Sequence, residues 1–138
     1  MKQGERINYI RRHRGMTMKQ LGMAVGFDDN TAAIRIAQYE GGARNPKPEI
    51  AHAMAQALNI HPNRLLPMPD DPVDAVIEHL LWLEDGETSR FYRESARLAG
   101  FLSQYWQQKA KVLSGEISHE DFIEWKLQWE KETTMSKE

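Results

Sequence analysis

The chain has 138 residues with 18 Lys or Arg, 20 Asp or Glu and no cysteine, for a formal net charge of −2. That length suits one ordinary domain, or a small domain with an appendage. Without cysteine, disulfides and thiolate zinc sites are excluded. The sequence has no apolar run of about 18 residues and no signal-peptide pattern at Met1. We therefore expect a cytoplasmic protein that does not cross a membrane.

The charge is divided unequally along the chain. Residues 1–66 hold ten Lys or Arg and five Asp or Glu, a net +5, whereas residues 67–138 hold eight and fifteen, a net −7. This asymmetry indicates a basic module that contacts phosphate and an acidic module with another role. The alternative is that the charges only keep the surface solvated.

The first predicted helix covers residues 4–14. Ile7 and Ile10, with Tyr9 beside them, form its buried side. Residues 11–14, Arg-Arg-His-Arg, come at its end, where cations suit the negative end of the helix dipole. We interpret them as solvated capping residues, and contact with a DNA backbone is the alternative.

The stretch 17–40 predicts two helices joined by a tight turn. Thr17 and Gln20 form the capping-box pattern, so the first helix begins at Met18. Gly26 ends it, because glycine adopts the left-handed conformation at little steric cost. The possible N-caps of the second helix are Asp28, Asp29 and Asn30. Its predicted buried side carries Ala32, Ala33, Ile36, Tyr39 and Glu40, and its opposite side carries Thr31, Ile34, Arg35 and Gln38.

Two more helices complete the first 66 residues. Gly41 and Gly42 stop the second helix of the pair, and Pro48 suits the first turn of the next one. Its apolar face consists of Ile50, Ala53, Met54, Ala57 and Leu58. A short helix follows from Pro62, and its Leu65 and Leu66 close the core.

This ordered set of residues resembles the Cro and phage-repressor (xenobiotic-response-element type) helix-turn-helix family over about residues 4–66. The resemblance is carried by Thr17, Leu21, Gly26, Ile36, Glu40 and the run 41–46, Gly-Gly-Ala-Arg-Asn-Pro. It implies a helix that lies in the major groove of double-stranded DNA. The implied base-reading residues are Asn30, Thr31, Ile34, Arg35, Ala37 and Gln38. The phosphate contacts expected with them are Thr17, Lys19, Arg44, Asn45 and Lys47.

The sequence departs from the family pattern between Phe27 and Thr31. These residues add about one helical turn to the usual spacing. Either the second helix begins early or the turn is a longer loop. Asp28 and Asp29 also bring negative charge towards the expected polyanion.

The second half of the chain predicts a linker and further helices. Residues 67–72 are rich in proline and polar side chains, which suits a linker. A helix from Pro72 to about Asp85 is apolar over most of its circumference, so we expect it to be buried. A long helix over 88–114 follows an approximate heptad seam, which predicts an association helix for a homodimer. Its dimerisation residues would be Phe91, Leu98, Leu102, Tyr105, Trp106 and Leu113.

A last helix opens at Ser118 and places three aromatic residues on one side. Phe122, Trp125 and Trp129 would pack on the long helix or on another subunit, and we favour packing within the chain. Residues 132–138 have no apolar pattern.

The sequence carries no recognisable catalytic constellation. Five histidines lie on different predicted helices, with no two at the spacing of a metal-binding pair: His13, His52, His61, His79 and His119. There is neither a glycine-rich phosphate loop after a strand nor a cysteine nucleophile. We expect no metal, no cofactor and no enzymatic activity.

The expected fold is all-α: a five-helix phage-repressor-like domain at 1–66, a linker at 67–72 and a helical dimerisation or partner-binding region at 73–138. The first functional hypothesis is a sequence-specific, dimeric repressor of its own or a neighbouring operon, from a bacterial mobile element or phage, with a palindromic operator. The second is an antitoxin or anti-CRISPR-like protein whose acidic C-terminal region binds a protein partner. In that case the helix-turn-helix would serve as autoregulator.

Overall fold

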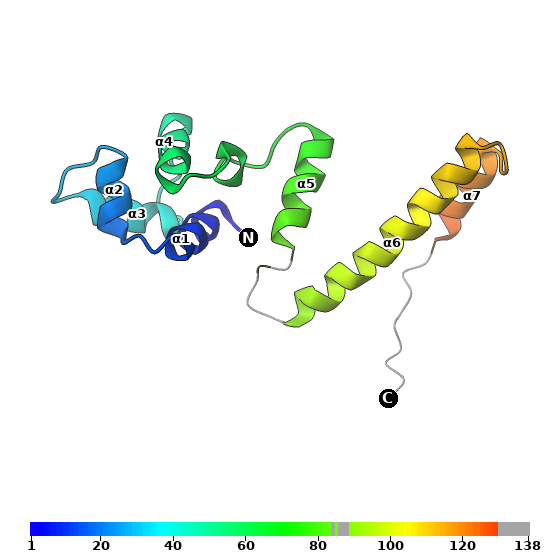
Figure 1. The fold of residues 1–138 in the computed structure, drawn as a ribbon, viewed down its shortest axis with the longest axis horizontal. Coiled ribbons are helices and arrows are strands. Elements are labelled where there is room, and N and C mark those ends of the chain that lie inside the picture. The colour runs from blue at the N-terminus through cyan, green and yellow to red at the C-terminus, as the bar shows by residue number, and fades with distance from the viewer. Residues whose placement is uncertain (84, 86–88, 130–138) are drawn as a thin grey trace. The chain divides into compact units, whose positions relative to one another are not determined.

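The computed structural model describes residues 1–83, 85 and 89–129, with the side chains of residues 89–94 left out of the description. This described part is all-helical, which confirms the predicted fold class (Figure 1). Its elements are α1 (Gln3–His13), α2 (Met18–Ala24), α3 (Ala32–Glu40), α4 (Pro48–Leu58), the 3-10 helix η1 (Pro62–Arg64), α5 (Pro72–Trp82), α6 (Ser89–Leu113) and α7 (His119–Gln128). The chain divides into two compact units between Phe91 and Tyr92. The predicted boundaries at 66 and 72 stay predictions.

The hydrophobic core of the first unit lies among α1 to α4 and η1. Each of these α-helices contributes at least one fully buried aliphatic or Met side chain, and Leu65 closes the core directly after η1. The largest of these side chains are Ile7, Leu21, Ile36, Met54, Leu58 and Leu65. All were expected in the core, so the spacing of apolar residues predicted it correctly.

Both signals at the ends of α2 act as predicted. The Thr17 hydroxyl accepts a hydrogen bond from the Gln20 backbone N–H at 3.0 Å, and the Gln20 side chain accepts one from the Thr17 N–H at 2.8 Å. Gly26 has a φ of 103°, in the left-handed region that disfavours a side chain. The helix therefore starts at Met18 and the chain can turn sharply after Ala24.

The two helices of the pair cross in very close contact. A Cβ atom added at Gly22 on α2 would lie 2.6 Å from the Ala32 carbonyl oxygen, at the start of α3. No side chain fits at that distance without moving the backbone. The absence of a side chain at Gly22 therefore fixes where α3 begins on α2.

The prediction that Asp28, Asp29 or Asn30 caps α3 is wrong. The N-cap position is Thr31, and its side chain makes no capping hydrogen bond to the helix. Residues 27–31 form a turn instead, in which the Ala32 N–H donates to the Asp28 carbonyl at 2.8 Å. Of the two alternatives for the extra residues, the structure has the longer loop. Asp29 instead forms an exposed ion pair with Lys19 at 2.7 Å.

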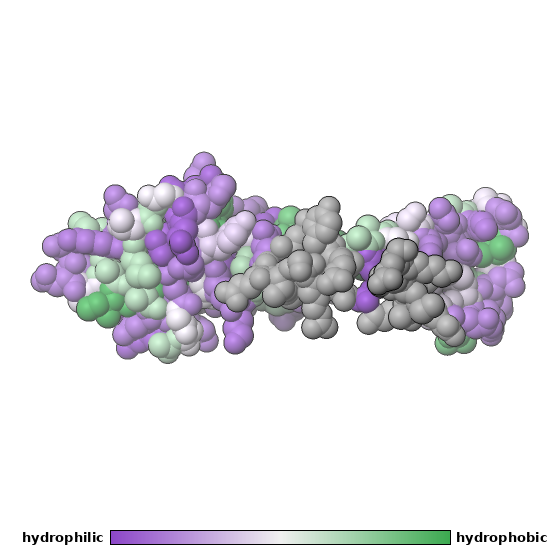
Figure 2. Space-filling model, turned by 90° about the horizontal axis from the view of Figure 1, so that it is seen from below, coloured by the Kyte–Doolittle hydropathy of each residue, from purple (hydrophilic) through white to green (hydrophobic). Residues whose placement is uncertain are grey.

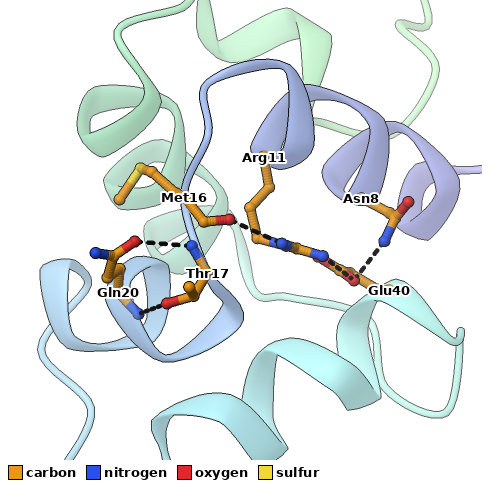
Figure 3. Close-up of polar contacts among 6 residues, drawn as sticks. All are labelled: Asn8, Arg11, Met16, Thr17, Gln20 and Glu40. Carbon is orange, nitrogen blue, oxygen red and sulfur yellow. Dashed lines mark hydrogen bonds and ion pairs between the residues drawn. The ribbon is translucent and has the colours of Figure 1, made fainter.

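A buried polar network joins α1 to α3 (Figure 3). The Arg11 guanidinium forms an ion pair with the Glu40 carboxylate, and its Nη1 also donates to the Met16 carbonyl at 2.8 Å. Asn8 donates to the same carboxylate at 2.8 Å. The interpretation of Arg11 as a solvated capping residue is therefore wrong, because the side chain turns inward to neutralise Glu40. Arg14 caps a different helix, since its Nε donates to the Leu58 carbonyl at 2.9 Å.

The C-terminal end of the domain is held by a second arginine. Arg6 is buried and donates to the carbonyls of Arg64 and Leu66 at 2.9 and 2.8 Å. Burial lowers the pKa of Arg6, and the nearby charge of Glu78 opposes that shift. These bonds satisfy carbonyl groups that would otherwise be unpaired after η1.

Helix α5 docks on this domain by its polar side. Glu78 is buried and forms an ion pair with Arg64. Trp82 packs against the core and lies edge-on to Tyr9, with ring centroids 6.0 Å apart, while the Tyr9 hydroxyl donates to Asp85 at 3.0 Å. That donation raises the pKa of Tyr9. These contacts anchor one side of α5 to the first unit.

The prediction that α5 is buried is wrong for most of its apolar residues. Val73, Val76, Ile77, Leu80 and Leu81 are all exposed. The physical reason is the docking side: Glu78 and Trp82 face the domain, so the residues on the other side of the helix face away from it. Tyr9, expected near the buried side of α1, is also exposed, at the edge of this contact.

The second unit is a helical hairpin held by aromatic side chains. Phe101 and Tyr105 of α6 contact Trp125 of α7, and Phe122 contacts both Tyr105 and Trp125. Trp129 lies edge-on to Phe101 at 4.8 Å and donates its indole N–H to Gln104 at 3.0 Å. The favoured prediction, packing of the last helix on the long one, is confirmed.

Within the described part of the chain, none of the helices has both the length and the apolar composition needed to cross a membrane. The surface in Figure 2 is mostly hydrophilic, with smaller groups of hydrophobic residues among the polar ones.

Candidate nucleic-acid interface

The outer face of α3 is polar and accessible. Ile36 and Tyr39 fix the rotation of the helix, because they are buried in the core one turn apart. The residues opposite them project outward, with Ile34 59% exposed. Of the six predicted base-reading residues, Asn30, Thr31, Ile34 and Ala37 are exposed, and Arg35 and Gln38 are partly exposed. Four of them, Thr31, Ile34, Arg35 and Gln38, share one helical face, while Asn30 lies in the preceding turn.

The guanidinium of Arg35 lies over the ring of an aromatic side chain, Phe27. Its guanidinium carbon lies 5.5 Å from the centroid of the Phe27 ring, within the range of a cation–π contact. Phe27 in turn packs against the core beside Tyr39, with ring centroids 6.3 Å apart. Such a contact restricts the long Arg side chain and directs it before any ligand binds.

The predicted phosphate-binding residues are all exposed: Thr17, Lys19, Arg44, Asn45 and Lys47. Thr17 and Lys19 lie at the start of α2, and Arg44, Asn45 and Lys47 lie between α3 and α4. Lys19 is tied to the loop before α3 through Asp29, and both side chains remain more than half exposed. A polyanion could therefore compete with this carboxylate for the ammonium group, because an exposed ion pair contributes little.

The loop after α3 is tied to the end of that helix. The backbone N–H of Arg44 donates to the Gln38 carbonyl at 3.2 Å, and Pro46 is buried beneath the loop. Lys47 then occupies the N-cap position of α4. These contacts fix the backbone that carries Arg44 and Asn45 close to the outer face of α3.

The arrangement offers three kinds of contact with nucleic acid. Arg35 can donate two parallel hydrogen bonds, Gln38 can donate and accept, and Ile34 can form an apolar contact. The cations on either side of α3 suit phosphate groups. A narrow α-helix with these side chains has the dimensions of the major groove.

Sequence reasoning missed two supporting features of this surface. The Arg11–Glu40 pair gave no signal because its members are 29 residues apart in the chain. Phe27 was counted only as part of an unexplained insertion. Its position immediately after Gly26, with a cationic residue eight positions later on the helix, was the one signal that could have suggested its role.

The predicted association residues on α6 differ in exposure. Leu98, Leu102 and Tyr105 are partly buried, and Tyr105 belongs to the aromatic hairpin. Trp106 and Leu113 are 64% and 87% exposed. The side chain of Phe91 lies outside the described residues. Their role in dimerisation stays a prediction.

Within the described residues, no group of three or more His, Asp or Glu side chains is placed to hold a metal ion.

The chain is similar to known proteins over its helix-turn-helix domain. A family model described as "Helix-turn-helix domain" matches residues 4–70. The transcriptional regulator BswR, whose crystal structure is known, has 30% sequence identity to this chain. The match covers 73% of this chain and 92% of BswR, with a TM-score of 0.45. No curated protein matches the sequence significantly. The chain therefore belongs to the helix-turn-helix family, whose domain it carries over residues 4–70.

Proposed function

We propose that the protein is a transcriptional regulator that reads a specific DNA sequence with α3. The observation that carries this proposal is the outer face of α3, on which Ile34, Arg35 and Gln38 project together from a rigidly packed helix. The family supports it, because helix-turn-helix domains use the second helix of the pair in the major groove.

Each side chain on this face suits a different base. Arg35 suits guanine, since its guanidinium can donate to O6 and N7 together. Gln38 suits adenine, and Ile34 suits the methyl group of thymine. A well-placed bidentate pair contributes about 1 to 3 kcal/mol of discrimination against the wrong base.

Affinity would come mainly from the phosphate contacts. Lys19, Arg44 and Lys47 carry the charge, and Thr17 and Asn45 add hydrogen bonds. Each cation that neutralises a phosphate lowers the slope of log K against log salt by about 0.9. Three such contacts predict a slope of about −3 per domain.

We further propose that the protein acts in the cytoplasm as a dimeric repressor of its own or a neighbouring operon on a bacterial mobile element. One domain of this size makes too few base contacts for useful specificity, which favours two domains on two half-sites about 34 Å apart. A two-fold symmetric dimer requires a palindromic operator.

Selection of bound fragments from random duplex DNA by the full chain tests the proposal. The expected result is one enriched palindromic motif. Recovery of no motif at moderate ionic strength would contradict DNA reading and favour a protein partner for the acidic C-terminal region. Enrichment of a single, non-palindromic half-site would keep DNA reading and contradict the symmetric dimer.

A further inference from the structure

We propose that the outward side of α5 is a self-association surface, on which a second copy of this chain packs its own α5 in antiparallel orientation. The inference specifies the dimer of the proposed function, but it does not depend on DNA reading by α3. It starts from the unusual docking of this helix, which buries a carboxylate and exposes its aliphatic side chains.

The exposed side chains form one continuous stripe. They follow steps of one, three and four residues, which place them on one side of a helix. Their exposed fractions lie between 41% and 65%. The stripe consists of Val73, Val76, Ile77, Leu80 and Leu81. Five half-exposed aliphatic side chains give an apolar patch on the order of 400 Å², which is the size of the largest such patch on a typical soluble protein, and that patch is often functional.

The stripe is complementary to itself. Val73, Val76, Ile77 and Leu80 are spaced symmetrically about the peptide bond between Val76 and Ile77. If two copies of α5 cross at that bond in opposite directions, Val73 of one copy meets Leu80 of the other, and Val76 meets Ile77. An isologous contact requires such a self-complementary patch. This spacing makes a second copy of α5 a fitting occupant.

Other occupants fit the surface less well. Residues 130–138 contain a single apolar residue, Met135, and so could not cover five aliphatic side chains. An anionic membrane is disfavoured, because helices that bind one carry Lys or Arg beside the apolar face. Residues 65–89 contain neither Lys nor Arg but seven Asp or Glu.

The size and charge of the surface determine how the dimer should behave. Two copies would together remove about 800 Å² from water, which belongs to the weak, concentration-dependent class of interfaces. Carboxylates flank the stripe on both copies and repel each other, so salt should strengthen the association. DNA binding should respond to salt in the opposite direction.

The location of α5 links this surface to α3. Both helices belong to the first compact unit, and the Arg64–Glu78 ion pair with Trp82 fixes α5 on it. Pairing of two α5 helices would therefore set the distance and direction between two α3 helices. The α6–α7 hairpin belongs to the other unit.

Sedimentation velocity of the full chain without DNA tests the inference. The wild-type protein should dimerise as its concentration rises through the micromolar range, and more strongly at higher salt. The variant Ile77→Glu with Leu80→Glu should raise the dissociation constant at least tenfold. Because both side chains are exposed, the far-UV circular dichroism spectrum and melting temperature should change little. The competing surface is the exposed part of α6, where the heptad pattern predicts dimerisation. It is tested by Trp106→Glu with Leu113→Glu, which should leave the dissociation constant unchanged.

The absence of native cysteine allows a second, independent readout. Oxidation of the Ile77→Cys variant should give a disulfide-linked dimer, whereas Leu113→Cys should give little. A monomeric wild-type protein at every concentration would overturn the inference. Dissociation by the α6 variant alone, or equal cross-linking of both cysteine variants, would overturn it as well. None of these three outcomes bears on base reading, which the selection experiment tests separately.

Discussion

Helices α3 and α5 both belong to the first compact unit. Each has one side packed on that unit and one side free, but the free sides differ in chemistry. Helix α3 buries Ile36 and Tyr39 and presents Arg35 and Gln38. Helix α5 buries Glu78 and presents aliphatic residues. The first arrangement is the ordinary amphipathic one, and the second is its inverse.

The difference indicates what each free side binds. A polar side with a guanidinium and an amide offers hydrogen bonds to base edges, and water can solvate it until DNA replaces the water. An aliphatic side gains nothing from water and is stabilised only when another apolar surface covers it. We therefore assign nucleic acid to α3 and protein to α5.

The largest expected effect concerns the packing of α3 on α2. Gly22→Ala places a Cβ 2.6 Å from the Ala32 carbonyl, so α3 must move, at a cost of about 3 kcal/mol. Gly100→Ala on α6 is the matched control, because a Cβ meets nothing within 4 Å there. Thermal unfolding should show a large loss for the first variant and a small gain for the second. Equal melting temperatures would contradict the close crossing of α2 and α3.

The next effect concerns the anchor of α5. Glu78→Gln breaks the ion pair with Arg64 and should cost about 2 kcal/mol, since Arg64 stays partly solvated and the full penalty of a buried unpaired charge does not apply. Hydrogen exchange should become faster in α5 and stay unchanged in α3. Asp74→Asn, at an exposed carboxylate of the same helix, is the control. Faster hydrogen exchange in both helices would show that loosening α5 also destabilises α3.

A smaller effect tests whether the free side of α3 is pre-arranged. Phe27→Leu keeps an apolar side chain against the core but removes the ring beneath Arg35, which should cost about 0.5 to 1 kcal/mol of discrimination. The loss should be confined to the base pair that Arg35 contacts. Binding to duplexes with single base changes measures it. A uniform loss at every position would indicate that Phe27 acts only through stability.

The smallest effect is a pH dependence at the end of α5. The hydrogen bond to Asp85 raises the pKa of Tyr9 above its ordinary value of 10.0, so its contribution to stability is present below pH 10 and is lost as the pH rises through the raised pKa. Exposure of Tyr9 to solvent keeps the contribution small. Tyr9→Phe should remove the loss of melting temperature that the wild-type protein shows as the pH rises above 10. An identical profile for both proteins would contradict the role of Tyr9 as an anchor.

The local features of the helix-turn-helix could be predicted from the sequence because their causes are local. Thr17 and Gln20 start α2 with a capping box that lies within four residues, and the spacing of Ile36 and Tyr39 fixes which side of α3 is free. The loop before α3 could not be predicted, because the Ala32 N–H donates to the backbone carbonyl of Asp28 and not to one of the side chains that the sequence offered as caps.

The buried polar contacts and the exposure of α5 could not be predicted from the sequence, for a related reason. Arg11 and Glu40 are far apart in the chain, so no local pattern pairs them. The apolar residues of α5 correctly indicate a surface to be covered, but periodicity does not say whether the cover comes from the same chain. The side of α5 that carries Glu78 and Trp82 packs on the first unit, so the stripe faces outward.

The most direct test of base reading by α3 is a fluorescence anisotropy titration of the selected duplex against a scrambled one. The wild-type protein should prefer the selected duplex, and Arg35→Ala with Gln38→Ala should lose at least about 30-fold of that preference. Arg12→Ala with Gln56→Ala, exposed residues of the same types on α1 and α4, should retain it. An unchanged preference in the α3 variant would contradict the account.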